Sequence, residues 1–106
     1  MKKEKNVENW VVVRSNLAGC FLGLLMAEEN IGSAKAVTLD QCRRLWRWSG
    51  AASLSQLALD GVAEAARCEC KFPPETNGHR IFGVDEIIPA TQKSVVSIKA
   101  VPPWKF

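Results

Sequence analysis

The sequence predicts an α+β domain: a small antiparallel sheet or partly open barrel of about five to six strands, with one short central helix and one short C-terminal helix. Three observations predict it. Runs of β-branched and other apolar residues alternate with turn residues, which indicates short strands. A capping-box sequence from Ser53 to Gln56 predicts the central helix. Thr91, followed by spaced valines, predicts the C-terminal helix.

The chain of 106 residues has room for one domain, which we expect over residues 9–106 after a flexible tail at residues 1–8. In the first half, strands are expected over residues 10–14, 20–27 and 35–39, with breaks at residues 15–19 and 28–33. The nearly continuous apolar run at 20–27 predicts burial on both faces of that strand. Gly23 within it indicates a bend, a bulge or a close backbone approach.

The stretch from Asp40 to Val62 holds the densest group of unusual residues, including two tryptophans and three arginines. As a strand it would place Arg44, Trp46 and Trp48 on one face, and as a helix it would make Arg44 and Trp48 neighbours. We favour extended structure because tryptophan prefers strands and Ser49-Gly50 ends the run. The central helix follows over residues 54–60, and Gly61 is suited to end it.

The second half predicts two more strands and the last helix. Strands are expected over residues 64–72 and 80–88, separated by a loop at residues 75–79 that contains an Asn-Gly turn. Pro89 would close the later strand. The helix capped by Thr91 would carry Val95, Val96 and Ile98 as its apolar residues. Pro102-Pro103 would end it, which leaves Trp104 and Phe106 to dock on the domain or on a neighbouring subunit.

Composition excludes several classes of protein. With 14 basic and 11 acidic residues the net charge is only +3, so nucleic acid is the less favoured partner. The longest apolar run is far shorter than the roughly 20 residues of a membrane span, and we expect no membrane association. Four cysteines are too few for a disulfide scaffold, which favours free thiols in a reducing cytosol. Cys68 and Cys70 are too close for a usual zinc knuckle, so no metal and no cofactor are expected.

We expect no enzymatic activity and no catalytic residues. The glycines do not form a phosphate-binding loop pattern. His79 could act as a base and Cys20, Cys42 or Cys68 as a nucleophile, but no pairing between them is visible. The adjacent carboxylates Asp85 and Glu86 would point to opposite faces of a strand.

The sharpest candidate site is a basic and aromatic cluster. Arginine offers a planar fork suited to phosphate, and a tryptophan face can stack on a base. The cluster therefore predicts a site for a small anionic, nucleotide-like ligand. The alternative is that both tryptophans fill the core and the arginines are solvated or ion-paired. The candidate residues are Arg43, Arg44, Trp46, Arg47 and Trp48.

Self-association is also expected. The apolar segment at residues 20–27 and the C-terminal sequence PPWKF offer surface that a second subunit could bury. A small domain gains from such burial, so we expect a homo-oligomer. The alternative is a C-terminal tail that closes its own core.

The sequence also resembles a family of small uncharacterised bacteriophage proteins over roughly residues 10–104. These carry an R-x-W-x-W-x-G-A core followed by an L-x-x-L-A-x-x-G-V helix. The matching positions are Val11 to Arg14; Ala18, Gly19 and Gly23; Arg44, Trp46, Trp48, Gly50 and Ala51; Leu54, Leu57, Ala58, Gly61 and Val62; Glu86 to Pro89; and Thr91. Residues 62–80 depart from the pattern, so the resemblance implies no role for Cys68, Cys70 or His79.

The resemblance implies a phage protein acting in the cytoplasm of the infected bacterial host or in the virion. We therefore expect a non-enzymatic binding protein that counteracts host defence, either by sequestering a small anionic ligand or by blocking a host protein. The alternatives are a virion structural or assembly protein and a nucleic-acid-binding accessory protein.

Overall fold

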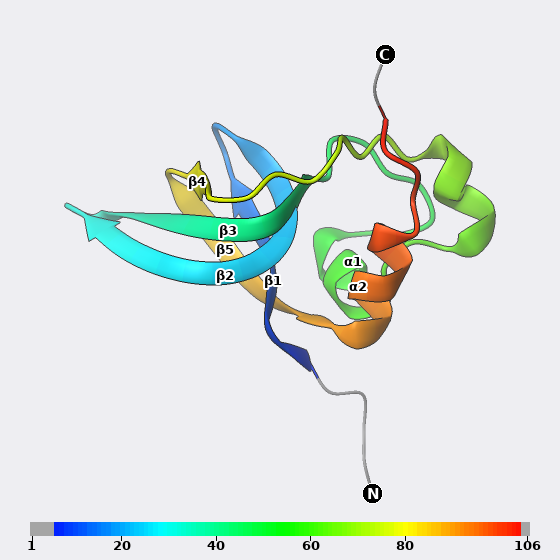
Figure 1. Ribbon diagram of the computed structural model, residues 1–106, viewed down its shortest axis with the longest axis horizontal. Helices are drawn as coiled ribbons and strands as arrows, with labels where there is room; N and C mark the ends of the chain where they lie inside the picture. Colours follow the sequence, from blue (N-terminus) through cyan, green and yellow to red (C-terminus); the bar gives the residue numbers. More distant parts are fainter. Residues whose placement is uncertain (1–5, 105–106) are drawn as a thin grey trace, which may run out of the picture.

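The computed structural model of the protein describes residues 6–104, and the side chains of residues 6–8, 65, 66 and 68 are not described. The fold is a five-stranded antiparallel sheet in the order β4-β3-β2-β1-β5, with two short α-helices (Figure 1). The elements are β1 (Asn6–Ser15), β2 (Gly19–Ile31), β3 (Ala34–Arg44), α1 (Leu54–Asp60), the 3-10 helix η1 (Glu64–Glu69), β4 (His79–Ile81), β5 (Val84–Thr91) and α2 (Gln92–Lys99). The predicted α+β class and both predicted α-helices are therefore confirmed.

The sheet is strongly curled but open. β4 and β5 follow one another in the chain, yet they occupy the two opposite edges of the sheet. Only Phe82 and Gly83 connect them, and Gly83 adopts a positive φ of 66° in this link. The hydroxyl of Ser15 in β1 donates to the Phe82 carbonyl at 2.8 Å, which fixes the link against the sheet. The predicted partly open barrel describes this arrangement well.

Two hydrophobic clusters lie on the two faces of the sheet, because successive side chains of a strand point to opposite faces. On β1, Val12 packs in the cluster shared with the helices, whereas Val11 and Val13 pack in the cluster inside the curl. On β2, Leu22 and Phe21 divide in the same way. The expected burial on both faces of β2 thus holds for these two residues, but the strand is exposed from Met26 onward.

The hairpin of β2 and β3 projects beyond the rest of the sheet (Figure 1). The prediction of a long turn at residues 28–33 is wrong, because β2 continues to Ile31 and only Gly32 and Ser33 form the turn. Gly32 has a positive φ of 63°, which suits a two-residue hairpin loop. An ion pair between Glu28 and Lys35 at 2.9 Å joins the strands near the tip. The register of β2 against β3 shifts at Gly23, where the sequence predicts a bend, a bulge or a close backbone approach.

Three further predictions are corrected. Residues 64–72 do not form a strand: the alanine-rich segment forms η1, in keeping with the low strand preference of alanine. The strand expected at residues 80–88 is divided into β4 and β5 by the link between them. Pro89 lies within β5, which tolerates it because β5 is an edge strand.

At the N-terminus, β1 begins at Asn6, inside the expected tail, and residues 1–5 lie outside the described part of the chain. The docking predicted for Phe106 lies outside it too.

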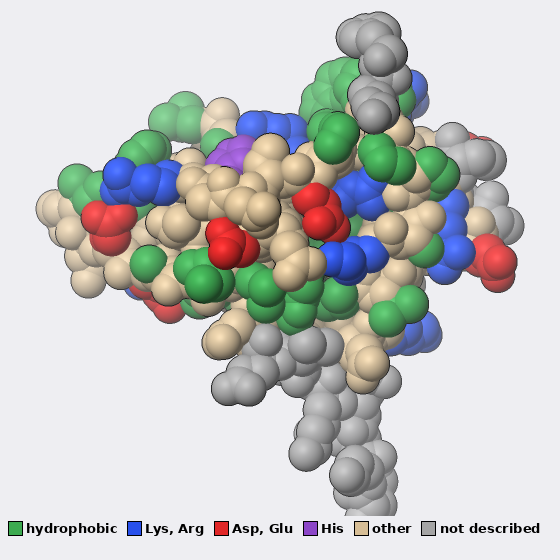
Figure 2. Space-filling model, in the orientation of Figure 1, with side chains coloured by type: hydrophobic (Ala, Val, Ile, Leu, Met, Phe, Trp, Pro, Cys, Tyr) green, Lys and Arg blue, Asp and Glu red, His purple; other side chains and the backbone are tan. Residues whose placement is uncertain are grey.

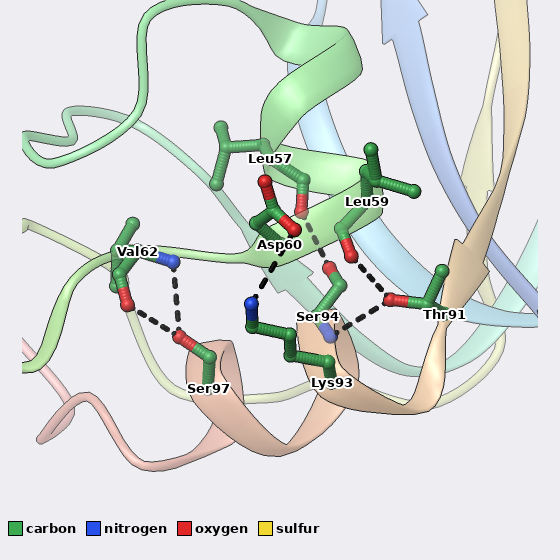
Figure 3. Close-up of polar contacts among 8 residues, drawn as sticks. All are labelled: Leu57, Leu59, Asp60, Val62, Thr91, Lys93, Ser94 and Ser97. Carbon is green, nitrogen blue, oxygen red and sulfur yellow. Dashed lines mark hydrogen bonds and ion pairs between the residues drawn. The ribbon is translucent and has the colours of Figure 1, made fainter. Parts of the chain in front are cut away.

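The two helices pack together on one side of the sheet (Figure 1). Hydroxyl groups of α2 and its cap complete the hydrogen bonding at the end of α1, as Figure 3 shows. Ser94 donates to the Leu57 carbonyl at 2.5 Å, and Thr91 donates to the Leu59 carbonyl at 2.6 Å. The Thr91 bond matters because the last carbonyls of a helix have no partner within the helix itself, whereas the Leu57 carbonyl also accepts from the Gly61 amide at 2.9 Å.

Candidate ligand-binding groove

The predicted extended conformation of the arginine- and tryptophan-rich stretch is confirmed. β3 runs to Arg44, and the chain then continues without regular structure to residue 50. Within this segment the backbones of Arg47 and Lys71 form an antiparallel bridge with two hydrogen bonds. The bridge holds the segment in place and presents the side chains between residues 44 and 48 in different directions.

Arg43 is a structural residue. Its side chain is only 3% exposed, and its guanidinium donates to the carbonyls of Phe72 at 3.1 Å, Pro73 at 3.1 Å and Ile98 at 2.7 Å. Burial lowers the pKa of this guanidinium, which reflects its removal from water. Because these donors are engaged inside the protein, Arg43 does not contribute to the candidate site.

Arg44 lies at the end of β3 on the opposite face. Its guanidinium sits 4.5 Å from the centre of the Phe21 ring and donates to the Ala18 carbonyl in the turn between β1 and β2. The side chain is half-buried, with one side against the sheet and the other on a surface hollow. It thus provides a fixed positive charge at the surface.

Trp46 is the most exposed aromatic residue of the predicted cluster, at 59% exposure. Its ring lies against that of Trp104, with centroids 4.8 Å apart and planes inclined by 33°. The ammonium of Lys71 lies 5.1 Å from the centre of the Trp104 ring, within the range of a cation–π contact. The C-terminal tryptophan therefore docks on its own domain, which is one of the two alternatives predicted for it.

The remaining two predicted residues differ from each other. Trp48 is half-buried and packs against the helix-side cluster, so it serves the core as well as the surface. The side chain of Arg47 is exposed and lines neither hollow described below. The structure thus brings together Arg44, Trp46 and Trp48.

Two adjoining hollows lie beside these residues. The larger, which we name the tryptophan groove, has a volume of about 470 Å³. The smaller, of about 160 Å³, shares Ala18, Gly19, Arg44 and Trp46 with it and adds Trp48. Among the described residues that line either hollow there is no Asp or Glu, and Arg44 is the charged one. The lining of the tryptophan groove is Asn16, Leu17, Ala18, Gly19, Arg44, Trp46, Pro73 and Trp104.

Sequence reasoning missed three contributors to this surface. Trp104 and Leu17 line the groove, and Lys71 lies over the outer tryptophan ring. Trp104 was noticeable as a large aromatic residue after a double proline, but its contact with Trp46 depends on the return of the C-terminal segment across the domain. Leu17 and Lys71 carried no signal, because a turn leucine and a single lysine are ordinary surface residues.

Of the candidates for catalysis, His79 and Cys42 do not line the tryptophan groove, whereas Cys20 lines the smaller hollow beside it. His79 shares a 2.8 Å hydrogen bond with Thr76, and burial, with a smaller contribution from Arg44, lowers the pKa of its imidazole. Burial raises the pKa of the Cys42 thiol to about 12, which leaves it unreactive near neutral pH. Cys20 and Cys42 are free thiols, while the side chain of Cys68 is not described.

No three His, Cys, Asp or Glu side chains within the described part of the chain lie close enough to hold a metal ion. No helix between residues 6 and 104 combines the length and hydropathy that crossing a membrane requires.

These observations define a small α+β protein with an open, curled sheet and a positively charged aromatic groove. Residues 8–98 match a protein family that is described as a domain of unknown function (DUF6948). The match covers most of the chain, and the protein belongs to this family. No curated protein and no solved structure matches the chain.

Proposed function

We propose that this protein is a non-enzymatic binding protein whose tryptophan groove holds a small planar ligand with an anionic group, such as a nucleotide. Trp46 would stack on the planar part, and Arg44 would contact the anionic group. The volume of the groove lies within the range of small-molecule sites, which is roughly 300–1,000 Å³. The absence of carboxylates from its described lining favours a negative ligand over a positive one.

The exposed Trp46 beside Arg44 is the observation that carries this proposal. A large aromatic side chain on the surface leaves apolar area in water, and such area often marks a site of interaction. Trp46 is held by Trp104 on one side, and Arg44 is held by Phe21 and Ala18. Both groups are therefore ordered before a ligand arrives, which reduces the entropy lost on binding.

Titration of the intrinsic tryptophan fluorescence tests the proposal. The probes are adenosine monophosphate, a cyclic dinucleotide and uncharged adenosine. We expect quenching by the charged probes and weaker binding of adenosine. Trp46→Ala should lower the affinity by about tenfold or more, since stacking on a base contributes about 1–3 kcal/mol. Calorimetry replaces fluorescence for this variant, because the reporting ring is lost.

Met26→Ala is the matched control, because Met26 is also 59% exposed but lies on the projecting part of β2, away from the groove. Its affinity for the probes should equal that of the wild-type protein. Binding that Trp46→Ala leaves unchanged, or no binding of any charged probe, would contradict the proposal.

A protein partner is the second candidate, favoured by Leu17. This residue is 95% exposed at the rim of the tryptophan groove, next to an aromatic surface. The partner would be a host protein or a second copy of this chain, as in the homo-oligomer expected from the sequence. Leu17→Ser should then weaken association, measured by sedimentation, without changing the affinity for nucleotides. Equal sedimentation of both proteins at all concentrations would argue against self-association through Leu17.

The wider biological role rests on the sequence resemblance to phage proteins. We infer action in the cytoplasm of an infected bacterium, against a host defence that uses the ligand as a signal. A virion protein and a nucleic-acid-binding protein remain alternatives. On the face in Figure 2, basic and acidic side chains are interspersed. This surface and the small net charge favour a small ligand over long nucleic acid.

A further inference from the structure

A second groove lies between α1, η1 and α2. We name it the helix groove; its volume is about 780 Å³. One wall is the helix contact drawn in Figure 3, where Asp60, Val62, Lys93 and Ser97 come together. The hydroxyl of Ser97 accepts from the Val62 amide at 2.9 Å and donates to its carbonyl at 2.7 Å, so this wall is rigidly bonded. No residue of the groove belongs to the tryptophan groove.

Arg67 of η1 supplies the unusual feature of the helix groove. Among the side chains that the structure describes, its Nε is the buried nitrogen or oxygen atom that lacks a hydrogen-bond partner. An unpaired buried donor is costly, and most such groups in proteins are paired with protein, water or ligand atoms. The Arg67 side chain lines the groove, so a ligand there could accept from its guanidinium, and a small rotation of the side chain would bring the shielded Nε within reach. A carboxylate fits best, because it matches the planar arginine fork.

The other charged residues of the helix groove indicate which charges the rest of the ligand would carry. Lys93 pairs with Asp60 at 3.5 Å, and both side chains are well exposed, so this ion pair is weak and can exchange partners. Glu64 adds a second carboxylate, which balances the charge of Arg67. Two positive and two negative groups around one groove suit a ligand that carries both signs. The apolar surface of Val96, which is exposed, offers contact for a short side chain.

We propose that the helix groove binds a small zwitterionic solute of the amino-acid class, with its carboxylate on Arg67 and its ammonium toward Asp60 and Glu64. This site is independent of the function proposed for the tryptophan groove. The balanced charges distinguish the two grooves, since Arg44 alone provides charge in the described lining of the tryptophan groove.

Amide chemical shifts of the full-length protein test this inference during titration with free amino acids. Acetate and ethylamine serve as probes of either charge alone. We expect at least one amino acid to shift the amides of residues 61–64 and 92–97, and to bind at least about tenfold more tightly than acetate or ethylamine. Arg67→Met should weaken this binding by about tenfold or more, because the carboxylate loses its charged donor.

Arg80→Met is the control, because Arg80 is exposed on β4 and does not line the groove. It should bind as the wild-type protein does. The melting temperature of Arg67→Met should be unchanged or higher, since the unpaired Nε is removed. If Arg67→Met fails to fold, Glu64→Gln takes its place and should weaken amino-acid binding more than acetate binding.

Three results would overturn the inference: no amide shift with any amino acid, shifts confined to the tryptophan groove, or acetate binding as tightly as the amino acids. Because nucleotide binding is measured at different residues, a failure here is distinct from a failure of the proposed function.

Discussion

Three arginines close together in the sequence have three different physical roles. Arg43 is enclosed and bonded to backbone carbonyls, Arg44 lies between the sheet and a groove, and Arg47 is exposed. Their identity as arginines predicted a positive site but could not rank them. The ranking depends on residues 72, 73 and 98, which lie far along the chain and meet Arg43 only in the fold.

Substitution of Arg43 should therefore affect stability far more than substitution of Arg47. We expect Arg43→Met to lower the free energy of unfolding by about 2–4 kcal/mol, because buried carbonyls lose charged donors. Arg47→Met should change it by less than about 0.5 kcal/mol, as for most surface positions. Urea denaturation followed by circular dichroism measures both. Equal stabilities of the two variants would show that the carbonyl bonds of Arg43 contribute nothing.

His79 should make stability depend on pH. Burial lowers the pKa of its imidazole below the usual 6.5, so the folded protein favours the neutral ring. The unfolded chain then takes up the proton first as the pH falls, and stability present above 6.5 is lost below it. His79→Gln should remove this part of the decline in melting temperature between about pH 7 and pH 5. If the melting temperatures of the two proteins decline equally over this interval, His79 is not the cause of the pH dependence.

At the scale of elements, local signals were sufficient for both α-helices. Ser53 accepts from the Gln56 amide at 3.1 Å, as the capping box predicts, although the Gln56 side chain bonds the Ala52 amide and not that of Ser53. The strand predicted at residues 64–72 failed, because apolar content alone does not distinguish a buried strand from a short helix. The pairing of β4 with β3 is likewise invisible in sequence, since the nearest paired positions, Leu39 and His79, are 40 residues apart.

Gly61 should be essential to the joint between α1 and α2. It has a φ of 74°, and a Cβ there would lie 2.5 Å from Ser97 Cβ and 2.6 Å from its hydroxyl. We expect Gly61→Ala to destabilise the protein by more than about 2 kcal/mol, through strain and overpacking. Gly78→Ala is the control: φ is also positive at 66°, but nothing lies within 4 Å, so the cost should be about 1–2 kcal/mol. Chemical denaturation of both variants measures the loss of unfolding free energy in each. Equal losses in the two variants would mean that Ser97 moves aside without cost and that the contact at Gly61 is not essential.

At the scale of the whole molecule, the curled sheet forms a scaffold that carries two unlike grooves. The tryptophan groove combines the β1–β2 turn, the end of β3 and the C-terminal segment, which are distant in sequence. For this reason the sequence predicted Arg44 and Trp46 but not the surfaces that complete the site. The helix groove had no sequence signal, because its residues are ordinary polar side chains until the helices pack.

Native mass spectrometry of the full-length protein, purified from cells that produce it naturally, tests the central claim about the tryptophan groove most directly. The expected result is a mass above that of the polypeptide alone, with a small nucleobase-containing ligand released on denaturation. The Trp46→Ala protein, purified in the same way, should carry little or none of this ligand, whereas Met26→Ala should carry as much as the wild type. Bare polypeptide in every preparation, or equal ligand in the wild-type and Trp46→Ala proteins, would contradict the claim.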